Sequence, residues 1–196
     1  LIVKTSREGS SKGIDRNSVV NNLDELKQRV EYISTIYHQP ALVEELIKGY
    51  EFTVAVIGNS PPEVMPIVQT TIDGKRNVGE EIYTNERIYS DAVKYECPAQ
   101  ISSSLQEKIE TIAAQVYQAV GCRDLGRIDF RVDENENPYV LEVNPLPGLD
   151  SDDVFNIFPQ TFGSDFTGII NRILNYALIR YKIIENEPTL ATGDIK

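Results

Sequence analysis

The sequence has few of the residues and segments that mark disulfide-rich, zinc-binding or membrane-spanning proteins. In 196 residues it has two cysteines, Cys97 and Cys122, one histidine, one methionine and no tryptophan. Two cysteines without a metal-type spacing predict neither a disulfide framework nor a zinc site, so buried thiols are expected. The longest apolar runs, such as residues 54–58 and 139–141, are far shorter than a membrane span, and no segment resembles a signal peptide. A cytoplasmic location is expected.

A shortage of basic residues excludes another class of partner. The 19 Lys and Arg residues are outnumbered by 30 Asp and Glu residues, which leaves a net charge of -11. Nucleic-acid binding needs a basic face that this composition does not easily supply. We therefore expect no nucleic-acid partner, and the short apolar runs predict no membrane partner. An acidic protein can still bind a nucleotide through a few placed lysines, backbone N–H groups and a metal ion.

Three segments have the apolar period of helices, and two of them also have capping signals. Asn22 with Glu25 caps an expected helix over residues 23–37, and Ser104 with Glu107 caps a second over 104–120, which ends at Gly121. A third helix is expected over 165–184. In the first helix the expected buried face consists of Leu23, Leu26, Val30, Ile33 and Tyr37.

Strand-like segments lie between these helices. They cover residues 1–4, 41–47, 51–57, 63–71, 126–132 and 138–144, whereas residues 73–97 lack a clear period and are expected to form a long loop. Helices and strands do not alternate strictly, which favours an α+β fold with mainly antiparallel sheets. The chain opens directly into a strand, without a start methionine or a turn, and this suggests that an N-terminal part of a longer protein is missing.

The hairpin of residues 126–144 carries the strongest local signal. If its turn is symmetric, Asp129 lies opposite Glu142. In the same register Arg127 lies opposite Asn144, and the strand period of two puts all four side chains on one face. Carboxylates directly across a strand pair repel unless a cation lies between them, and oxygen ligands of this kind suit magnesium. A solvated polar face on an edge hairpin is an equally weighted alternative.

Two further segments suit a nucleotide, although each is weak evidence alone. Lys4 ends a strand and precedes the glycine- and serine-rich loop 5–13, whose N–H groups and hydroxyls can surround phosphate oxygens. Most such loops are simply turns. In residues 42–54, Glu51 can accept hydrogen bonds from both hydroxyls of a ribose, but carboxylates beside apolar runs are common on protein surfaces.

Several motifs occur together in a specific order. They are Ile2-Val3-Lys4, Ser6-Arg7-Glu8-Gly9-Ser10-Ser11, Val43-Glu44-Glu45, Glu51-Phe52-Thr53-Val54, Gly126-Arg127-Ile128-Asp129, Leu141-Glu142-Val143-Asn144-Pro145 and Pro147-Gly148. In this order the chain resembles the D-alanine–D-alanine ligases of the ATP-grasp family from residue 1 to about residue 180. The resemblance implies an ATP-grasp fold with ATP between two lobes, and Mg²⁺ (or Mn²⁺) beside it. Residues 1–60 would belong to the small lobe, 61–185 to the large lobe and 186–196 to a flexible tail.

The resemblance also implies roles for individual residues. Those at the nucleotide would be Lys4 and Ser11 at the phosphates, Glu44, Glu45 and Ile47 at adenine, Leu141 beneath adenine, and Glu51 at the ribose. Those at the metal would be Asp129, Glu142 and Asn144, and those that assist the reaction would be Arg127, Ser10 and Gly148.

The implied reaction is ATP-dependent formation of an amide or peptide bond through an acyl phosphate, on an amino-acid or peptide substrate. Asp153 falls near the serine that holds the second substrate's carboxylate in the family, which favours an acceptor other than D-alanine. Arg87 stands where the family loop usually has a lysine. An ATP-binding fragment or pseudo-ligase without turnover is the alternative. A homodimer of the full-length protein is left open.

Overall fold

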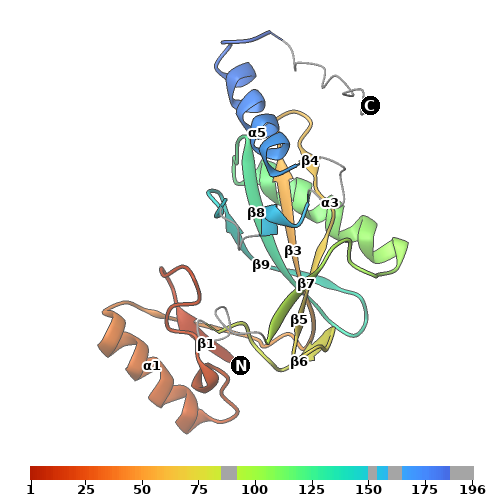
Figure 1. Ribbon diagram of the computed structural model, residues 1–196. Coiled ribbons are helices and arrows are strands. Elements are labelled where there is room, and N and C mark those ends of the chain that lie inside the picture. The colour runs from red at the N-terminus through yellow and green to blue at the C-terminus, as the bar shows by residue number, and fades with distance from the viewer. Residues whose placement is uncertain (85–91, 150–153, 159–164, 186–196) are drawn as a thin grey trace. The chain divides into compact units, whose positions relative to one another are not determined.

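The computed structural model describes residues 1–84, 92–149, 154–158 and 165–185 (Figure 1). Chain contacts divide the protein into two compact units. Unit 1 consists of Leu1–Glu51, Thr70–Tyr95 and Arg131–Tyr139, and unit 2 of Phe52–Gln69, Glu96–Phe130 and Val140–Lys196. The lobes predicted as 1–60 and 61–185 stay a prediction, because ligand-binding lobes need not coincide with units defined by contacts. The predicted tail at 186–196 lies outside the described residues.

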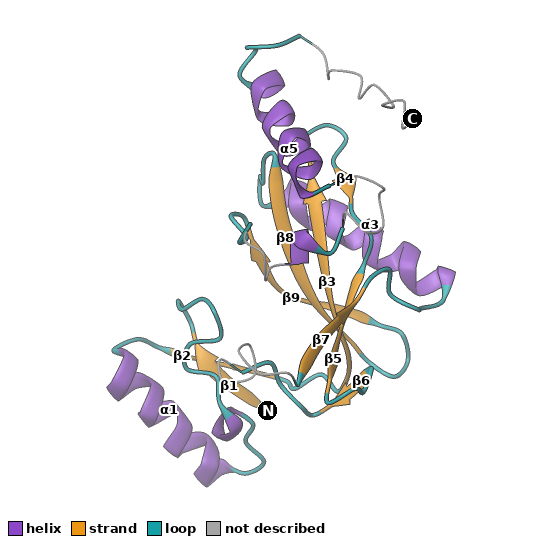
Figure 2. Ribbon diagram, in the orientation of Figure 1, coloured by secondary structure: helices purple, strands orange, loops and turns teal. Residues whose placement is uncertain are grey.

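The N-terminal part of unit 1 is a helix with a two-stranded sheet. Strands β1 (Ile2–Thr5) and β2 (Ala41–Glu44) pair antiparallel, with Lys4 opposite Leu42. The 3-10 helix η1 (Arg16–Ser18) and helix α1 (Leu23–Tyr37) connect them. Figure 2 shows these helices and strands by type.

Seven of the described strands form a second sheet. They are β3 (Gly49–Ile57), β4 (Glu63–Val64), β5 (Val68–Ile72), β6 (Asn77–Gly79), β7 (Val93–Glu96), β8 (Leu125–Val132) and β9 (Pro138–Asn144). The order is β7-β5-β3-β8-β9, and β4 and β6 pair antiparallel with β3. The α+β fold with antiparallel sheets is therefore confirmed.

Three strand predictions need correction. The predicted strand 63–71 is two strands, because Pro66 has no N–H to donate in the middle of a strand. Gly49 belongs to β3, which begins two residues before the predicted residue 51. Its φ of 137° and the 2.2 Å between an added Cβ and a carbonyl oxygen of β8 require glycine there. The predicted loop 73–97 contains β6 and β7, which are too short to show a period in the sequence.

Helix α1 has the predicted bounds, and Asn22 caps it by accepting from the backbone N–H of Asp24 and Glu25. Its buried face was predicted incorrectly in part. Leu23 is 61% exposed, whereas Arg29 is buried together with Ile33. Arg29 is buried because its guanidinium finds acceptors at the start of the chain, which the apolar period does not reveal.

The other two helices also form, with shifted ends. Helix α3 (Ser103–Ala119) is capped by Ser102, whose hydroxyl accepts from the N–H of Leu105 at 3.1 Å, so the predicted cap at Ser104 is wrong. Ser102 has the extended backbone that a capping residue needs. Gly121 follows the helix with a φ of 73°, as expected for a C-terminal glycine. Helix α5 (Phe166–Arg180) ends four residues before the predicted residue 184.

The apolar core of unit 2 lies where α5 and the 3-10 helix η2 (Val154–Asn156) meet the sheet. Phe155 and Phe158 are buried there with an edge-to-face contact of 5.6 Å between ring centroids. Cys122 is buried and Cys97 half-buried, and burial raises the pKa of the Cys122 thiol. Among the described helices, none is long and apolar enough to cross a membrane.

Candidate functional site

Asp129 on β8 lies at the centre of a hydrogen-bonded cluster in unit 2. Its Oδ1 accepts from Thr53 Oγ1 at 2.9 Å and from Arg127 Nε at 3.1 Å. Its Oδ2 accepts from Arg127 Nη2 at 3.1 Å and from Asn144 Nδ2 at 3.1 Å. The Asp129 side chain is 17% exposed. Carboxylate oxygens accept hydrogen bonds, so these donors fix the direction of both Asp129 oxygens.

Asn144 connects Asp129 with the second carboxylate of the hairpin. Its Nδ2 atom also donates to Glu142 Oε1 at 3.2 Å. The structure therefore brings the three predicted metal ligands together, and Arg127 lies with them. Repulsion between the carboxylates is reduced by the Arg127 guanidinium and the Asn144 amide. The direct opposition of Asp129 and Glu142 across the strands stays a prediction.

The donors in this cluster fit magnesium better than a metal held by protein ligands alone. Among the described residues, no group of three or more His, Cys, Asp or Glu side chains is placed to hold a metal. Magnesium usually takes one or two carboxylates and completes its coordination with waters and substrate phosphates. Asp129 and Glu142 would supply these carboxylates if a magnesium ion bound here. Asn144 donates through Nδ2 here, so its amide oxygen would have to turn toward a metal.

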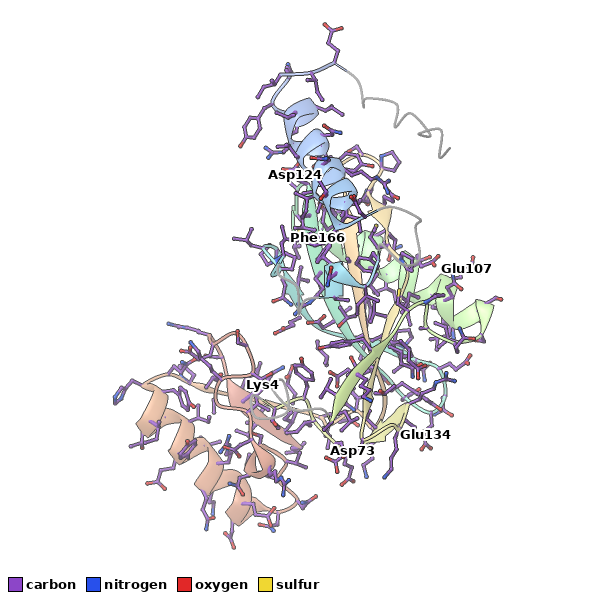
Figure 3. The ribbon with its side chains drawn as sticks, in the orientation of Figure 1. Lys4, Asp73, Glu107, Asp124, Glu134 and Phe166 are labelled. Atoms are coloured by element: carbon purple, nitrogen blue, oxygen red, sulfur yellow. The ribbon has the colours of Figure 1, made fainter. Side chains whose placement is uncertain are left out.

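In unit 1, two predicted nucleotide ligands contact each other. Lys4 on β1, which Figure 3 labels, and Glu44 at the end of β2 form an ion pair of 2.5 Å between Nζ and Oε2, with side chains 20% and 39% exposed. Glu45 and Ile47 follow β2, exposed and half-buried respectively. Lys48 pairs with Glu80, and that hydrogen bond raises the pKa of Lys48. The charge of Lys4 is balanced by the carboxylate of Glu44.

The glycine- and serine-rich loop has an unusual backbone at the two serines. Ser10 and Ser11 both have a φ of 54°, a left-handed conformation that non-glycine residues adopt at an energetic cost. Two short turns surround them, with hydrogen bonds from Lys12 N to Gly9 O at 3.1 Å and from Ile14 N to Ser11 O at 3.0 Å. Ser10 is exposed and Ser11 half-buried. The loop therefore has a defined turn conformation.

Side chains from outside the loop hold both of its ends. Gln39 Oε1 accepts from the backbone N–H of Arg7 at 2.8 Å, and Gln39 Nε2 donates to Glu8 Oε1 at 2.9 Å. At the other end, Arg29 Nη2 donates to the carbonyl oxygen of Gly13 at 2.7 Å. Sequence reasoning assigned no role to Gln39 or Arg29, since neither lies in a recognisable motif.

Glu51, the predicted ribose ligand, is paired with a buried arginine on β8. Glu51 Oε2 lies 3.0 Å from Arg131 Nη2, and the side chains are 13% and 5% exposed. Arg131 also donates to the carbonyl oxygen of Gly79 at 3.3 Å and to that of Glu81. Sequence reasoning missed Arg131 and also missed the contact of Thr53 with Asp129. The alternation of side chains along residues 127–131 was the available sequence signal for Arg131, since it puts Arg131 on the same face of β8 as Arg127 and Asp129.

The remaining predicted residues lie apart from these contacts or outside the described residues. Leu141 on β9 is 39% exposed. Gly148 is exposed and follows the buried Pro147. Asp153 and Arg87, singled out as departures from the family pattern, lie outside the described residues.

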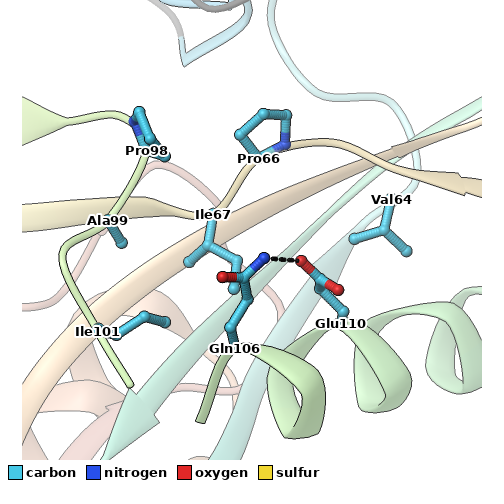
Figure 4. Close-up of a pocket in the computed structure, with 8 residues that line it drawn as sticks. All are labelled: Val64, Pro66, Ile67, Pro98, Ala99, Ile101, Gln106 and Glu110. Atoms are coloured by element: carbon cyan, nitrogen blue, oxygen red, sulfur yellow. Dashed lines mark hydrogen bonds between the residues drawn. The ribbon is translucent and has the colours of Figure 1, made fainter. Parts of the chain in front are cut away.

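A pocket of about 250 Å³ in unit 2 is separate from the predicted site residues (Figure 4). Gln106 Nε2 and Glu110 Oε1 on α3 form a hydrogen bond of 2.7 Å at its wall. It is lined by Val64, Pro66, Ile67, Pro98, Ala99, Ile101, Gln106 and Glu110. None of these is a candidate ligand of metal or nucleotide, and the pocket has no role in the proposed site.

Known proteins match most of this chain. A family model described as D-ala D-ala ligase C-terminus matches residues 1–175. The uncharacterised protein y4sG of Sinorhizobium fredii is 37% identical over 183 residues, which cover 92% of this chain and 53% of that protein. A D-alanine–D-alanine ligase of Actinobacillus succinogenes is 35% identical over 179 residues, which cover 91% and 54% respectively. The chain spans about half the length of the curated relatives it matches.

Solved structures share the fold. A D-alanine–D-alanine ligase from Bacillus anthracis aligns with a TM-score of 0.72 and 24% identity, covering 93% of this chain and 55% of that one. The structure of the B. anthracis ligase complexed with ATP aligns with a TM-score of 0.68 and 21% identity, covering 85% of this chain and 50% of that one. At these identities the likeness concerns the fold alone.

Proposed function

Because the chain belongs to the family of D-alanine–D-alanine ligase C-terminal domains, which has the ATP-grasp fold, we propose that it is the ATP- and magnesium-binding part of an ATP-dependent carboxylate–amine ligase. The observation that carries this proposal is the cluster of Asp129, Asn144 and Glu142. Two carboxylates and a carboxamide converge where a metal bound to phosphate oxygens can take them as ligands.

The nucleotide ligands in the proposal lie mainly on and beside strands β1, β2 and β3. Lys4 and the loop that carries Ser11 would bind the phosphates, and phosphate would replace Glu44 as the partner of the Lys4 ammonium. Glu44, Glu45 and the backbone of Ile47 would border adenine, and Glu51 would hold the ribose. Leu141 would supply apolar contact beneath the base. The contact of Lys4 with Glu44 supports this assignment, since it brings a cation and an adjoining carboxylate to the same strand pair.

In the reaction that we propose, a substrate carboxylate attacks the γ-phosphorus of ATP, ADP leaves and an acyl phosphate forms. A substrate amine then attacks the acyl carbon, the carbon–nitrogen bond forms, and phosphate and a proton leave. Magnesium, when bound, neutralises phosphate charge. Arg127 would stabilise the negative charge of the tetrahedral species, together with the backbone around Gly148, and Ser10 would lie in the loop over the phosphates.

The proposal includes general expectations for the substrate, the partners and the cellular location. The substrate would be an amino acid or a peptide, with an acceptor other than a second D-alanine, since Asp153 adds a negative charge where the family holds the acceptor's carboxylate. A cytoplasmic location and a homodimer are the expectations that accompany this function.

A nucleotide-binding protein without turnover is the second candidate. The same cluster of Asp129, Asn144 and Glu142 supports it, since a metal bound to ATP takes such ligands whether or not a ligation follows. Both candidates predict binding of ATP with magnesium, so turnover has to separate them.

Phosphate release by the intact protein, measured with ATP, Mg²⁺ and a panel of amino acids and dipeptides, tests the proposal. We expect release with at least one substrate and a loss of at least a hundredfold in Asp129→Asn and Glu142→Gln, since each removes a charge that the metal needs. ATP binding without release from any substrate would favour the second candidate. A melting temperature that does not rise with ATP and Mg²⁺ would refute both.

Two control variants separate the metal effect from a general change of charge. Asp73→Asn and Glu107→Gln make the same chemical changes at exposed positions outside the cluster, and Figure 3 labels both residues. Phosphate release in these controls should stay within about twofold of the wild type, as expected for exposed substitutions.

A further inference from the structure

We propose that Arg131 positions Glu51 for recognition of the ribose and thereby sets the preference of the protein for ribonucleotides. This inference rests on the proposed function, in which Glu51 binds the ribose hydroxyls. Arg131 itself would not touch the nucleotide. It would act through the orientation and the charge of Glu51.

The pair of Glu51 and Arg131 is largely buried. Arg131 Nη2 lies 3.0 Å from Glu51 Oε2, and the two side chains are only 5% and 13% exposed. Removing two charged groups from water costs free energy that an apolar pair would not cost, so such a pair is weak evidence for a purely stabilising role. The largely buried carboxylate of Glu51 is better explained by a ligand that donates hydrogen bonds to it.

Arg131 is itself held in place by further hydrogen bonds. Its guanidinium also donates to the carbonyl oxygens of Gly79 and Glu81, which lie in and after β6. Glu51 is on β3 and Arg131 on β8, so the planar group joins three segments of unit 1. Arginine presents donors in a fixed plane, whereas lysine offers a flexible point charge. The Glu51 carboxylate is therefore oriented by a rigid neighbour rather than by a mobile one.

The hydroxyls of a ribose suit a fixed carboxylate. Both ribose hydroxyls can donate to one carboxylate, and charge-assisted hydrogen bonds are stronger than neutral ones when the acceptor is fixed. A nucleotide that lacks the 2′- or the 3′-hydroxyl loses one such bond. The difference in affinity between ATP and its deoxy analogues therefore reports the position of the Glu51 carboxylate.

The test is isothermal titration calorimetry of the intact protein with ATP, 2′-deoxy-ATP and 3′-deoxy-ATP in the presence of Mg²⁺, which gives the dissociation constant of each nucleotide. In the wild type we expect ATP to bind roughly tenfold more tightly than each analogue. Arg131→Met keeps an unbranched stem of similar volume but removes the charge and all donors, and we expect the preference to fall below about threefold. Arg131→Lys keeps the charge and should retain a preference between those two values.

Each outcome bears on a different claim. Absence of ATP binding in the wild type would refute the proposed function, and binding without a preference for ATP would refute the role of Glu51. A folded Arg131→Met with the wild-type preference would refute the role of Arg131. If Arg131→Met does not fold, Arg131→Gln takes its place, because its amide can still donate to a backbone carbonyl, and an unchanged preference in that variant would likewise refute the inference.

Arg172→Met is the matched control. Arg172 on α5 pairs with Glu63 in unit 2, and the two side chains are 26% and 31% exposed. The control therefore breaks an arginine–glutamate pair that has no part in the proposed site. It should lower the melting temperature and leave the preference for ATP unchanged. An equal loss of preference in the control would show that the effect of Arg131→Met is not specific to Glu51.

Discussion

Replacement of Thr53 by valine tests whether the Asp129 carboxylate is oriented for a metal. Thr53 Oγ1 donates to Asp129 Oδ1 at 2.9 Å from the adjoining strand β3. Valine has nearly the same shape as threonine but cannot donate this bond. Residues that orient a metal ligand through a hydrogen bond typically contribute tenfold to a hundredfold to metal affinity.

The structure favours the lower end of that range. Four hydrogen bonds from described side chains reach Asp129, two of them from Arg127, so Thr53→Val removes one donor and leaves three. The Asp129 side chain is 17% exposed, and water can replace part of the lost bond. A charge-assisted hydrogen bond contributes about 1.5 kcal/mol at the lower end of the measured values, which corresponds to a change of roughly tenfold.

The assay is titration of Mn²⁺ in the presence of ATP, followed by electron paramagnetic resonance of the free ion. We expect the dissociation constant to rise about tenfold in Thr53→Val. Thr53→Ser retains the hydroxyl and should restore the affinity to within about threefold of the wild type. Thr53 does not orient Asp129 for a metal if Thr53→Val binds Mn²⁺ as tightly as the wild type. The same holds if Thr53→Ser does not restore an affinity that Thr53→Val has lost.

Three further predictions concern stability, each measured by unfolding in urea. Tyr117→Phe should cost about 1 to 2 kcal/mol, because it leaves the buried carbonyl oxygen of Gly58 without its 2.8 Å hydrogen bond, and a change below about 0.3 kcal/mol would contradict this. Hydrogen bonds from Arg180 lower the pKa of Asp124, so the pair stabilises the protein above the ordinary pKa of an aspartate, about 3.9, and that contribution is lost as the pH falls through the lower folded pKa. Arg180→Met should therefore lose less stability than the wild type between pH 6 and pH 3, and equal losses would refute the assignment. Gly49→Ala should destabilise by about 3 kcal/mol or more, since the added Cβ would lie 2.2 Å from a backbone carbonyl oxygen, and a soluble variant of wild-type stability would refute the clash.

The sequence by itself determined the features that depend on local chemistry. Asn22 caps α1 because its side chain reaches N–H groups two and three residues ahead, and the bounds of that helix follow from the capping and the apolar period. The hairpin from residue 126 to residue 144 was predictable for the same reason, since alternation and a polar turn lie within about twenty residues. The motifs of the candidate metal ligands lie on this hairpin.

Only the tertiary structure decided which side chains complete the site. Thr53 and Asp129 are 76 positions apart, and Glu51 meets Arg131 across a similar separation. Their contacts depend on which strands become neighbours in the sheet. A pattern along one strand shows which side chains share its face, but it does not show which residue of another strand lies opposite them. For that reason the sequence indicated the carboxylates that bear the chemistry, whereas the hydroxyl and the guanidinium that orient them became apparent only in the fold.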